Sequence, residues 1–237
     1  MSNRPSTLLP QPGLSSEGSL FPINELERLR ILRLYQILDT AAEQAFDDLT
    51  HLAATICEVP IALISLVDEH RQWFKAKVGI GASETARSAA FCAHAILGEE
   101  ILVVQDALQD QRFASNPLVL GEPKVRFYAG APLVVKQGIS LGTVCVIDQR
   151  PRVLNPSQLG ALDIIRRTVV GLLEGRRAML DLKVLTKTLS VCSWCRSVKT
   201  EDGNWTEMHK YLNRAVSVTH GICPRCFERE LPELTPP

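Results

Sequence analysis

The chain has 237 residues, 46% hydrophobic and 22% charged, which is enough apolar side chain for one sizeable core and a smaller appendage. Its 26 basic and 26 acidic residues cancel, so no charge excess favours a nucleic acid or an anionic membrane surface as partner. The sequence shows neither a secretion signal nor an apolar run of membrane-spanning length, and we expect a cytoplasmic protein with reduced cysteines.

The N-terminal part predicts a tail followed by two helices. Residues 1–20 are rich in Ser, Pro and Gly, which is typical of a disordered segment. Asn24 is the expected N-cap of the first helix, with Glu27 completing a capping box. A second helix is predicted from Glu43 to Cys57, because its apolar residues recur on one face.

The middle of the chain predicts strands with one short helix among them. Ile61–Val67 is apolar on both faces, so this strand should be central. A helix is expected between Ser88 and Leu97, and Gln137-Gly138 should form a hairpin turn. The remaining predicted strands cover residues 72–78, 101–105, 127–135 and 140–147. This order of elements indicates an α+β fold with a mixed sheet covered by helices.

A long helix is predicted over residues 156–188, after the start signal Asn155-Pro156-Ser157. Leu162, Ile165, Val169 and Leu172 follow the 3-4-3 spacing of a helix–helix contact. We therefore expect a homodimer through residues 156–188. The alternative is that the first half of this helix packs on the protein's own sheet, which explains the same spacing.

Four stretches resemble the GAF domains of bacterial signalling proteins. They are PIALISLVDEHRQWFKA (60–76), FCAHAIL (91–97), LVVQDALQDQRFASNPLV (102–119) and VRFYAGAPLVV with GISLGTVCVID (125–148). The resemblance covers about residues 25–173. It implies a GAF/PAS-like antiparallel sheet in residues 21–155, with helices on one face and a small-molecule pocket on the other.

The resemblance places that pocket between Cys92 and Tyr128. Polar side chains gathered beside aromatic ones could orient an unknown small-molecule ligand there. The expected ligand-binding residues are Trp73, Phe91, Cys92, His94, Asp106, Arg112, Phe113, Asn116, Arg126 and Tyr128. The alternative is that Asp106, Arg112 and Arg126 cap helix ends and pair with one another.

Two special GAF activities are weighed against the sequence. Bilin-binding photoreceptors attach a chromophore through a cysteine, but the order and spacing around Cys92-Ala93-His94 differ from theirs. Free methionine sulfoxide reductases need a second thiol, and residues 106–126 contain no partner for Cys92. No other catalytic motif is present. The chain is therefore expected to sense or connect rather than catalyse.

The C-terminal residues 189–237 contain two cysteine pairs, Cys192-x-x-Cys195 and Cys223-x-x-Cys226. This spacing lets each turn direct two thiolates at one ion, which predicts a closed, structural four-cysteine zinc site. His220 could replace a cysteine or bind in the outer shell. A helix containing Trp205, Met208, Tyr211 and Leu212 is expected between the pairs.

Together these features predict a signal-transduction protein with a GAF sensor, a helix that relays the signal, and a zinc-stabilised tail that contacts a signalling partner. The first alternative is a thiol or metal redox sensor that releases zinc from the C-terminal cysteines on oxidation. The second is an enzyme that acts on a small oxidised metabolite, such as free methionine sulfoxide, with Cys92 as nucleophile.

Overall fold

The computed structural model describes residues 21–185, 190–200 and 202–215, and the chain divides into two compact units at Met179 and Leu180. The expected disordered tail, residues 1–20, and the end of the predicted long helix, residues 186–188, lie outside the described residues. None of the helices in the described ranges is both long and apolar enough to cross a bilayer.

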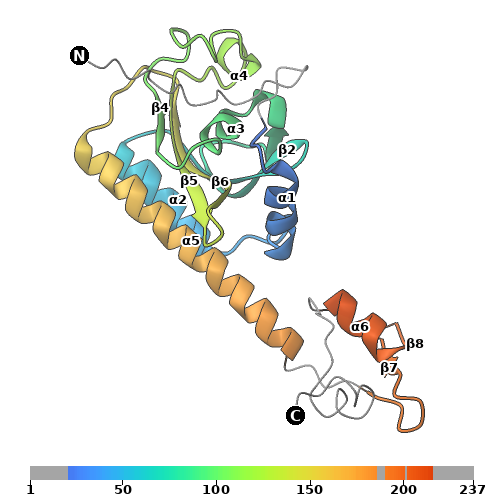
Figure 1. Ribbon diagram of the computed structural model, residues 1–237. Helices are drawn as coiled ribbons and strands as arrows, with labels where there is room; N and C mark the ends of the chain where they lie inside the picture. The colour runs from blue at the N-terminus through green and yellow to red at the C-terminus, as the bar shows by residue number, and fades with distance from the viewer. Residues whose placement is uncertain (1–20, 186–189, 201, 216–237) are drawn as a thin grey trace, which may run out of the picture. The chain divides into compact units, whose positions relative to one another are not determined.

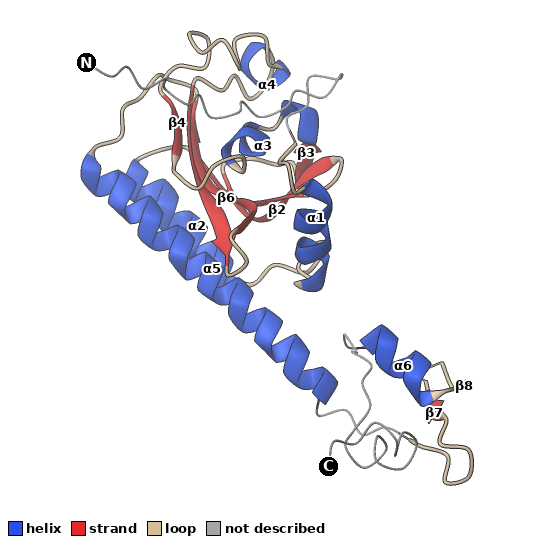
Figure 2. Cartoon of the chain, in the orientation of Figure 1, coloured by secondary structure: helices blue, strands red, loops and turns tan. Residues whose placement is uncertain are grey.

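The first unit is built on a six-stranded antiparallel sheet with the strand order β3-β2-β1-β6-β5-β4 (Figures 1 and 2). The predicted α+β class and the antiparallel sheet implied by the GAF resemblance are thus confirmed. The mixed sheet expected from the order of elements is wrong, because every strand pair of this sheet is antiparallel. The strands are β1 Ile61–Val67, β2 Arg71–Val78, β3 Glu84–Ala86, β4 Leu102–Val104, β5 Phe127–Val135 and β6 Ile139–Asp148.

β1 lies in the middle of the sheet, between β2 and β6, as predicted from its apolar character on both faces. All seven of its residues are buried. A bulge between Ile64 and Ser65 shifts its register with β2, so that Ser65 pairs with Phe74 and Leu66 with Trp73. The expected hairpin turn joins β5 to β6, and Gly138 adopts φ +70° there, a conformation that favours glycine.

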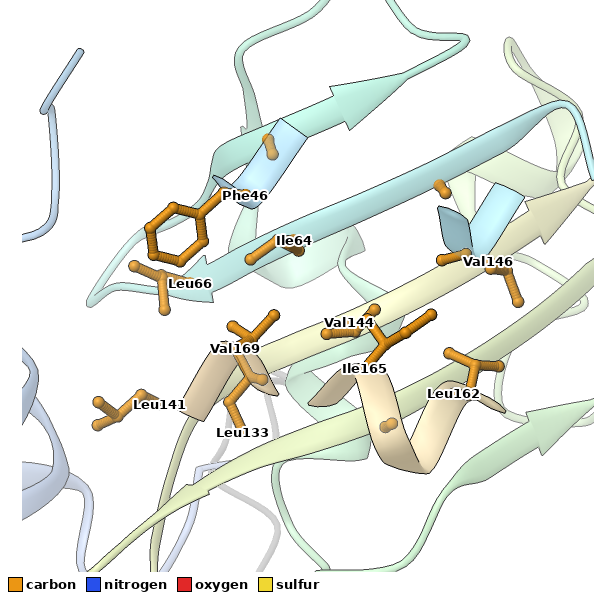
Figure 3. Packing of buried hydrophobic residues seen from close by; sticks show 14 of the residues in the cluster. Phe46, Ile64, Leu66, Leu133, Leu141, Val144, Val146, Leu162, Ile165 and Val169 are labelled. Atoms are coloured by element: carbon orange, nitrogen blue, oxygen red, sulfur yellow. The ribbon is translucent and has the colours of Figure 1, made fainter. Parts of the chain in front are cut away.

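Helices α2 (Gln44–Cys57) and α5 (Pro156–Leu185) cover one face of the sheet (Figure 1). Leu162, Ile165 and Val169 of α5 are buried against strand residues such as Leu133 and Val144 (Figure 3). The 3-4-3 spacing therefore reflects packing on the protein's own sheet, the alternative considered above. The fourth residue of the pattern, Leu172, is only partly buried, and Leu173 is buried in its place.

The starts of the helices agree with the predictions in position but not always in chemistry. α1 spans Glu25–Leu34, and its N-cap Asn24 makes no side-chain capping bond, while Glu27 pairs with Arg30 instead. The expected capping box is therefore absent there. At the start of α5, by contrast, Asn155 and Gln158 each accept a hydrogen bond from the other's backbone N–H, at 2.9 and 3.1 Å.

The other face of the sheet is covered by short elements and loops. The single helix expected at 88–97 is divided into a 3₁₀ turn, η1 (Arg87–Ala89), and α3 (Phe91–Ala95), because Ala90 between them is extended. β3 and α4 (Pro117–Leu120) were not predicted, and each has only three or four residues, few of them apolar in β3.

The second unit contains the short hairpin β7 (Val198–Lys199) and β8 (Trp205–Thr206), followed by α6 (Met208–Ala215). The expected helix thus begins at Met208, and Trp205 belongs to a strand instead. Gly203 forms the turn before β8 with φ +86°.

Candidate functional site

The loop-covered face of the sheet has a buried polar cluster at its centre, built around the thiol of Cys92. Strand alternation supplies three of its members, because Ser65 in β1 pairs directly with Thr143 in β6 and Cys145 follows two residues later. Tyr128 in β5 reaches the same face, and α3 places Cys92 above all of them. We call Ser65, Cys92, Tyr128, Thr143 and Cys145 the thiol cluster.

Four groups surround the Cys92 sulfur. Thr143 Oγ1 donates to it at 3.0 Å, and Ser65 Oγ and Tyr128 OH donate at 3.3 Å each. The Sγ atom of Cys145 lies 3.8 Å away. All five side chains are buried among apolar residues, where each polar atom needs such a partner.

This environment separates the acidities of the two thiols. Burial raises the pKa of Cys92, but its hydrogen bonds with Cys145, Ser65, Thr143 and Tyr128 outweigh burial and lower the pKa below its usual value. The hydrogen bond to Cys92, together with burial, raises the pKa of Cys145 well above its usual value. Cys92 is therefore the sulfur that loses its proton first.

Aromatic side chains form the roof of the thiol cluster. Phe91 stacks on Phe113 with ring centroids 4.0 Å apart, and its ring lies 5.2 Å from that of Tyr128. His94 meets Phe113 edge-on at 4.6 Å. Burial, followed by the nearby Arg112 charge, lowers the pKa of His94, so its imidazole is neutral near pH 7.

A cavity of about 40 Å³ adjoins the cluster, and we call it the Cys92 cavity. It can hold a water molecule or a group of similar size, and it is far smaller than the ~300–1,000 Å³ of typical ligand sites. Its lining is mostly apolar and consists of Leu63, Gln72, Phe74, Ile80, Thr85, Phe91, Cys92, Leu118, Pro123, Val125, Tyr128 and Ile147.

A much larger hollow, about 710 Å³, lies at the surface near the turn between β1 and β2. Its charged residues are already paired with one another, since Arg71 binds Asp39 at 2.6 Å and Glu84 at 2.7 Å. The thiol cluster, with its converging donors and shifted pKa values, is therefore the better candidate for chemistry.

Five of the residues expected to bind a ligand come together around this roof and cluster: Phe91, Cys92, His94, Phe113 and Tyr128. Trp73 does not join them. It lies in the core on the α2 side of the sheet, and its neighbours Gln72 and Phe74 line the Cys92 cavity in its place.

The remaining expected residues have structural partners. Arg126 binds both carboxylate oxygens of Asp106 at 2.8 Å, and Arg112 binds Asp110 at 2.6 Å. Asn116 caps α4 by accepting from the Leu118 N–H and donates to the Ala89 carbonyl. These contacts fit the alternative in which the loop charges pair and cap.

Ser65, Thr143 and Cys145 were not among the site residues predicted from the sequence. The partner thiol for Cys92 was sought in residues 106–126, but it lies in β6, 53 residues along the chain. The i, i+2 spacing of Thr143 and Cys145 was a visible signal. Its meaning depended on the register between β1 and β6, which spacing alone does not give.

In the tail, Cys192 and Cys195 lie on one tight turn. The Cys192 N–H donates to the Ser197 carbonyl at 2.8 Å, and Arg196 adopts φ +62°. Hydrogen bonding to Ser197 lowers the pKa of Cys195 to about 7. Cys223, Cys226 and His220 lie outside the described residues. Within the described part of the chain, no three metal-binding side chains come together.

Comparison with known proteins identifies relatives of the first unit. The chain is 44% identical over 132 residues to a cyclic di-GMP phosphodiesterase of Pseudomonas aeruginosa, a match that covers 56% of this chain and 22% of that protein. The chain thus spans about a fifth of this relative's length.

Two solved structures are similar to this chain. One is the GAF domain of an Acinetobacter phosphoenolpyruvate-protein phosphotransferase, with 21% identity, a TM-score of 0.49, and coverage of 67% of this chain and 97% of that one. The other is a domain of a sensor histidine kinase protein from Sinorhizobium meliloti, with 18% identity, a TM-score of 0.48, and coverage of 61% and 99%. The GAF domain family matches residues 41–170, more than half of the chain, and the protein belongs to the GAF family.

Proposed function

We propose that this protein is a cytoplasmic signalling sensor in which the GAF domain detects a small molecule and passes the change to α5. One observation supports this most directly. The central strands carry the thiol cluster on one face and contact α5 on the other. In β6, Cys145 belongs to the thiol cluster, whereas its neighbours Val144 and Val146 point to the opposite face and pack with Ile165 of α5 (Figure 3). A change in the Cys92 cavity can thus reach α5 through one layer of backbone.

The size of the cavity constrains the ligand. A pocket of about 40 Å³ admits a diatomic or triatomic molecule as it stands, and a larger ligand requires α4 and its loop to move away. Free methionine sulfoxide is larger than this space and would enter only after such a movement. The reductase activity is therefore not our first proposal, although Cys145 supplies the second thiol that residues 106–126 lack.

Two variants of α4 test this function. Leu118 lines the cavity, whereas Leu120 on the same helix is 65% exposed. The full chain is incubated with the small-molecule fraction of a bacterial extract, and native mass spectrometry and amide hydrogen exchange in α5 are recorded. We expect a bound mass and altered exchange in the wild type and in Leu120→Trp, and neither in Leu118→Trp. Equal binding by both variants, or exchange in α5 that does not respond, would rule out this sensor.

We also propose that residues 189–237 bind one zinc ion through Cys192, Cys195, Cys223 and Cys226. The tight turn at Cys192 supports this, because it holds two thiols within one short loop. The lowered pKa of Cys195 favours the thiolate that zinc requires. One equivalent of zinc in the purified chain, lost in a Cys192→Ser/Cys195→Ser variant, is the expected result. A chain that purifies without metal from zinc-supplemented cells would contradict it.

A second candidate function is a thiol sensor in this tail. The exposed Cys195, with a pKa of about 7, is the observation that favours it, because an accessible thiolate reacts readily with oxidants. Mild peroxide should then release the zinc, and added thiol should restore binding. Zinc that stays bound after peroxide treatment would exclude this function.

The homodimer through residues 156–188 is proposed on the exposed face of α5. Leu162, Ile165 and Val169 are used by the protein's own core, whereas Ile164 is 58% and Met179 is 63% exposed. Gly171 and Gly175 lie between them without side chains that would keep a second helix away. We expect light scattering to give the mass of a dimer for the wild type and of a monomer for Ile164→Arg. A monomeric wild type would refute the dimer.

We propose the exposed Trp194 as the contact for a signalling partner.

A further inference from the structure

Two of the five cysteines in the described residues approach each other inside the GAF core. Cys92 comes from α3 and Cys145 from β6, and their sulfur atoms are 3.8 Å apart, which is van der Waals contact for two thiols. Cys57 is also buried, but it lies in the core on the α2 side of the sheet. Burial raises the pKa of Cys57 to about 11. The protein therefore contains a buried thiol pair and, across the sheet, a buried single thiol.

We infer that Cys92 and Cys145 are a peroxide-oxidisable pair that closes to a disulfide within the GAF core. This inference goes beyond the proposed ligand sensor and does not depend on it. It rests on the contact between the two sulfurs, the three hydroxyl donors around Cys92, and the cavity that leads to that sulfur.

The reaction has two balanced steps. The Cys92 thiolate attacks one oxygen of hydrogen peroxide, the O–O bond breaks, and sulfenic acid forms while the departing hydroxide takes up the proton released by Cys92 as water. The Cys145 sulfur then attacks the Cys92 sulfur, an S–S bond forms, and the sulfenic oxygen leaves with the Cys145 proton as a second water. Two thiols and one peroxide thus give one disulfide and two waters.

The hydroxyl groups fit this chemistry. Thr143, Ser65 and Tyr128 donate toward the Cys92 sulfur and stabilise its thiolate in an otherwise apolar core. Cys145 is already in contact, so the sulfenic acid can be converted to a disulfide without a second molecule.

The size of the Cys92 cavity limits which oxidants can reach the Cys92 sulfur. Cys92 lines the cavity of about 40 Å³, which suits hydrogen peroxide but excludes glutathione and other bulky thiols or disulfides. The oxidised product should therefore be the internal disulfide, not a mixed disulfide. Its formation shortens the sulfur–sulfur distance from 3.8 Å to about 2.05 Å.

Peptide mapping of the full chain of 237 residues tests the inference. Trypsin separates the three buried cysteines into residues 34–71 with Cys57, 88–112 with Cys92 and 137–152 with Cys145. After treatment with hydrogen peroxide and alkylation under denaturing conditions, we expect peptides 88–112 and 137–152 to be linked, with Cys57 alkylated as a free thiol. The inference would be overturned if Cys92 and Cys145 are both recovered as free thiols under conditions that oxidise the tail cysteines.

Three variants sharpen the test. Cys145→Ser should stop the reaction at the sulfenic acid of Cys92. Because Cys92 is buried, dimedone is added while the protein is denatured, so that it can reach and label this sulfenic acid. Thr143→Val keeps the side-chain shape and removes one donor, and it should slow linkage about tenfold, the equivalent of one hydrogen bond of about 1.4 kcal/mol. Cys57→Ser should react like the wild type. If Thr143→Val forms the disulfide at the wild-type rate, the thiol cluster does not assist the reaction. If glutathione becomes attached to Cys92, the Cys92 cavity does not exclude bulky thiols.

Discussion

Arg28 donates through Nε and Nη2 to both carboxylate oxygens of Glu25, at 2.7 and 2.8 Å, within the first two turns of α1. Glu25 also accepts from Arg87 of η1, so one carboxylate serves two buried guanidinium groups. Arg28 Nη1 donates in addition to the carbonyl of Val67 at the end of β1. These contacts attach the start of α1 and the η1–α3 segment to the same strand end.

Removing the charge of Glu25 should therefore destabilise the whole GAF domain. In Glu25→Gln, two buried guanidinium groups lose their counter-ion, and the expected loss is about 3 kcal/mol of the free energy of unfolding in urea. Glu27→Gln is the matched control, since the Glu27–Arg30 pair has the same i, i+3 spacing but is exposed. A loss no larger than that of the control would show that Glu25 does not hold the arginines.

The same carboxylate predicts a dependence of stability on pH. Burial raises the pKa of Glu25, but hydrogen bonds from Arg28 and Arg87 outweigh it and keep the pKa below the usual 4.5. The unfolded chain thus takes up a proton near pH 4.5, and the folded chain does so only at lower pH. The stabilisation by Glu25 is complete above pH 4.5 and is lost as the pH falls through the lower pKa of the folded chain. The difference in unfolding free energy between the wild type and Glu25→Gln should shrink below pH 4.5, and a constant difference would contradict this.

Arg176 and Arg177 of α5 bind backbone carbonyls at the end of α1. Arg176 donates to the carbonyls of Tyr35 and Gln36 at 3.0 and 2.7 Å, and Arg177 donates to that of Leu34 at 2.7 Å. Cations at the C-terminal carbonyls of a helix are favourable. The two arginines thus attach α5 to the end of α1.

Arg176→Ala should loosen this attachment without unfolding the domain. We expect a loss of about 1–2 kcal/mol, together with faster amide hydrogen exchange at the end of α1 and in residues 172–179. Arg167→Ala is the control, because Arg167 lies on the same helix but pairs with Asp163 at the surface. Equal exchange in the two variants would show that the α1 carbonyls do not hold α5.

The sequence predicted the sheet well because β1 is apolar on both faces and the hairpin turn requires glycine. It placed Trp73 in the pocket, because alternation alone does not say which face of β2 meets the loops. The bulge between Ile64 and Ser65 then changes the pairing within β1. The thiol cluster depends on the register between β1 and β6, which pairs Ser65 with Thr143, and on the extended residue Ala90 that precedes α3. Neither is a local property of the sequence.

Gly142 connects the stability of the sheet with the thiol cluster. A Cβ atom at this position would lie 1.9 Å from the carbonyl oxygen of Ser65, in the backbone of the central strand. Gly142→Ala must push β6 away from β1, and such overpacking costs typically 1–3 kcal/mol; we expect about 3 because neither strand can yield easily. Gly81→Ala is the control, since its Cβ meets nothing within 4 Å.

The shift caused by Gly142→Ala should also separate Ser65 and Thr143 from the Cys92 sulfur. The variant is therefore expected to be less stable in urea and, under conditions where it is fully folded, slower to link Cys92 with Cys145 in peroxide. Gly81→Ala should match the wild type in both measurements. A Gly142→Ala variant that loses stability but forms the disulfide at the wild-type rate would show that the hydroxyl donors of the cluster do not assist the Cys92 thiolate.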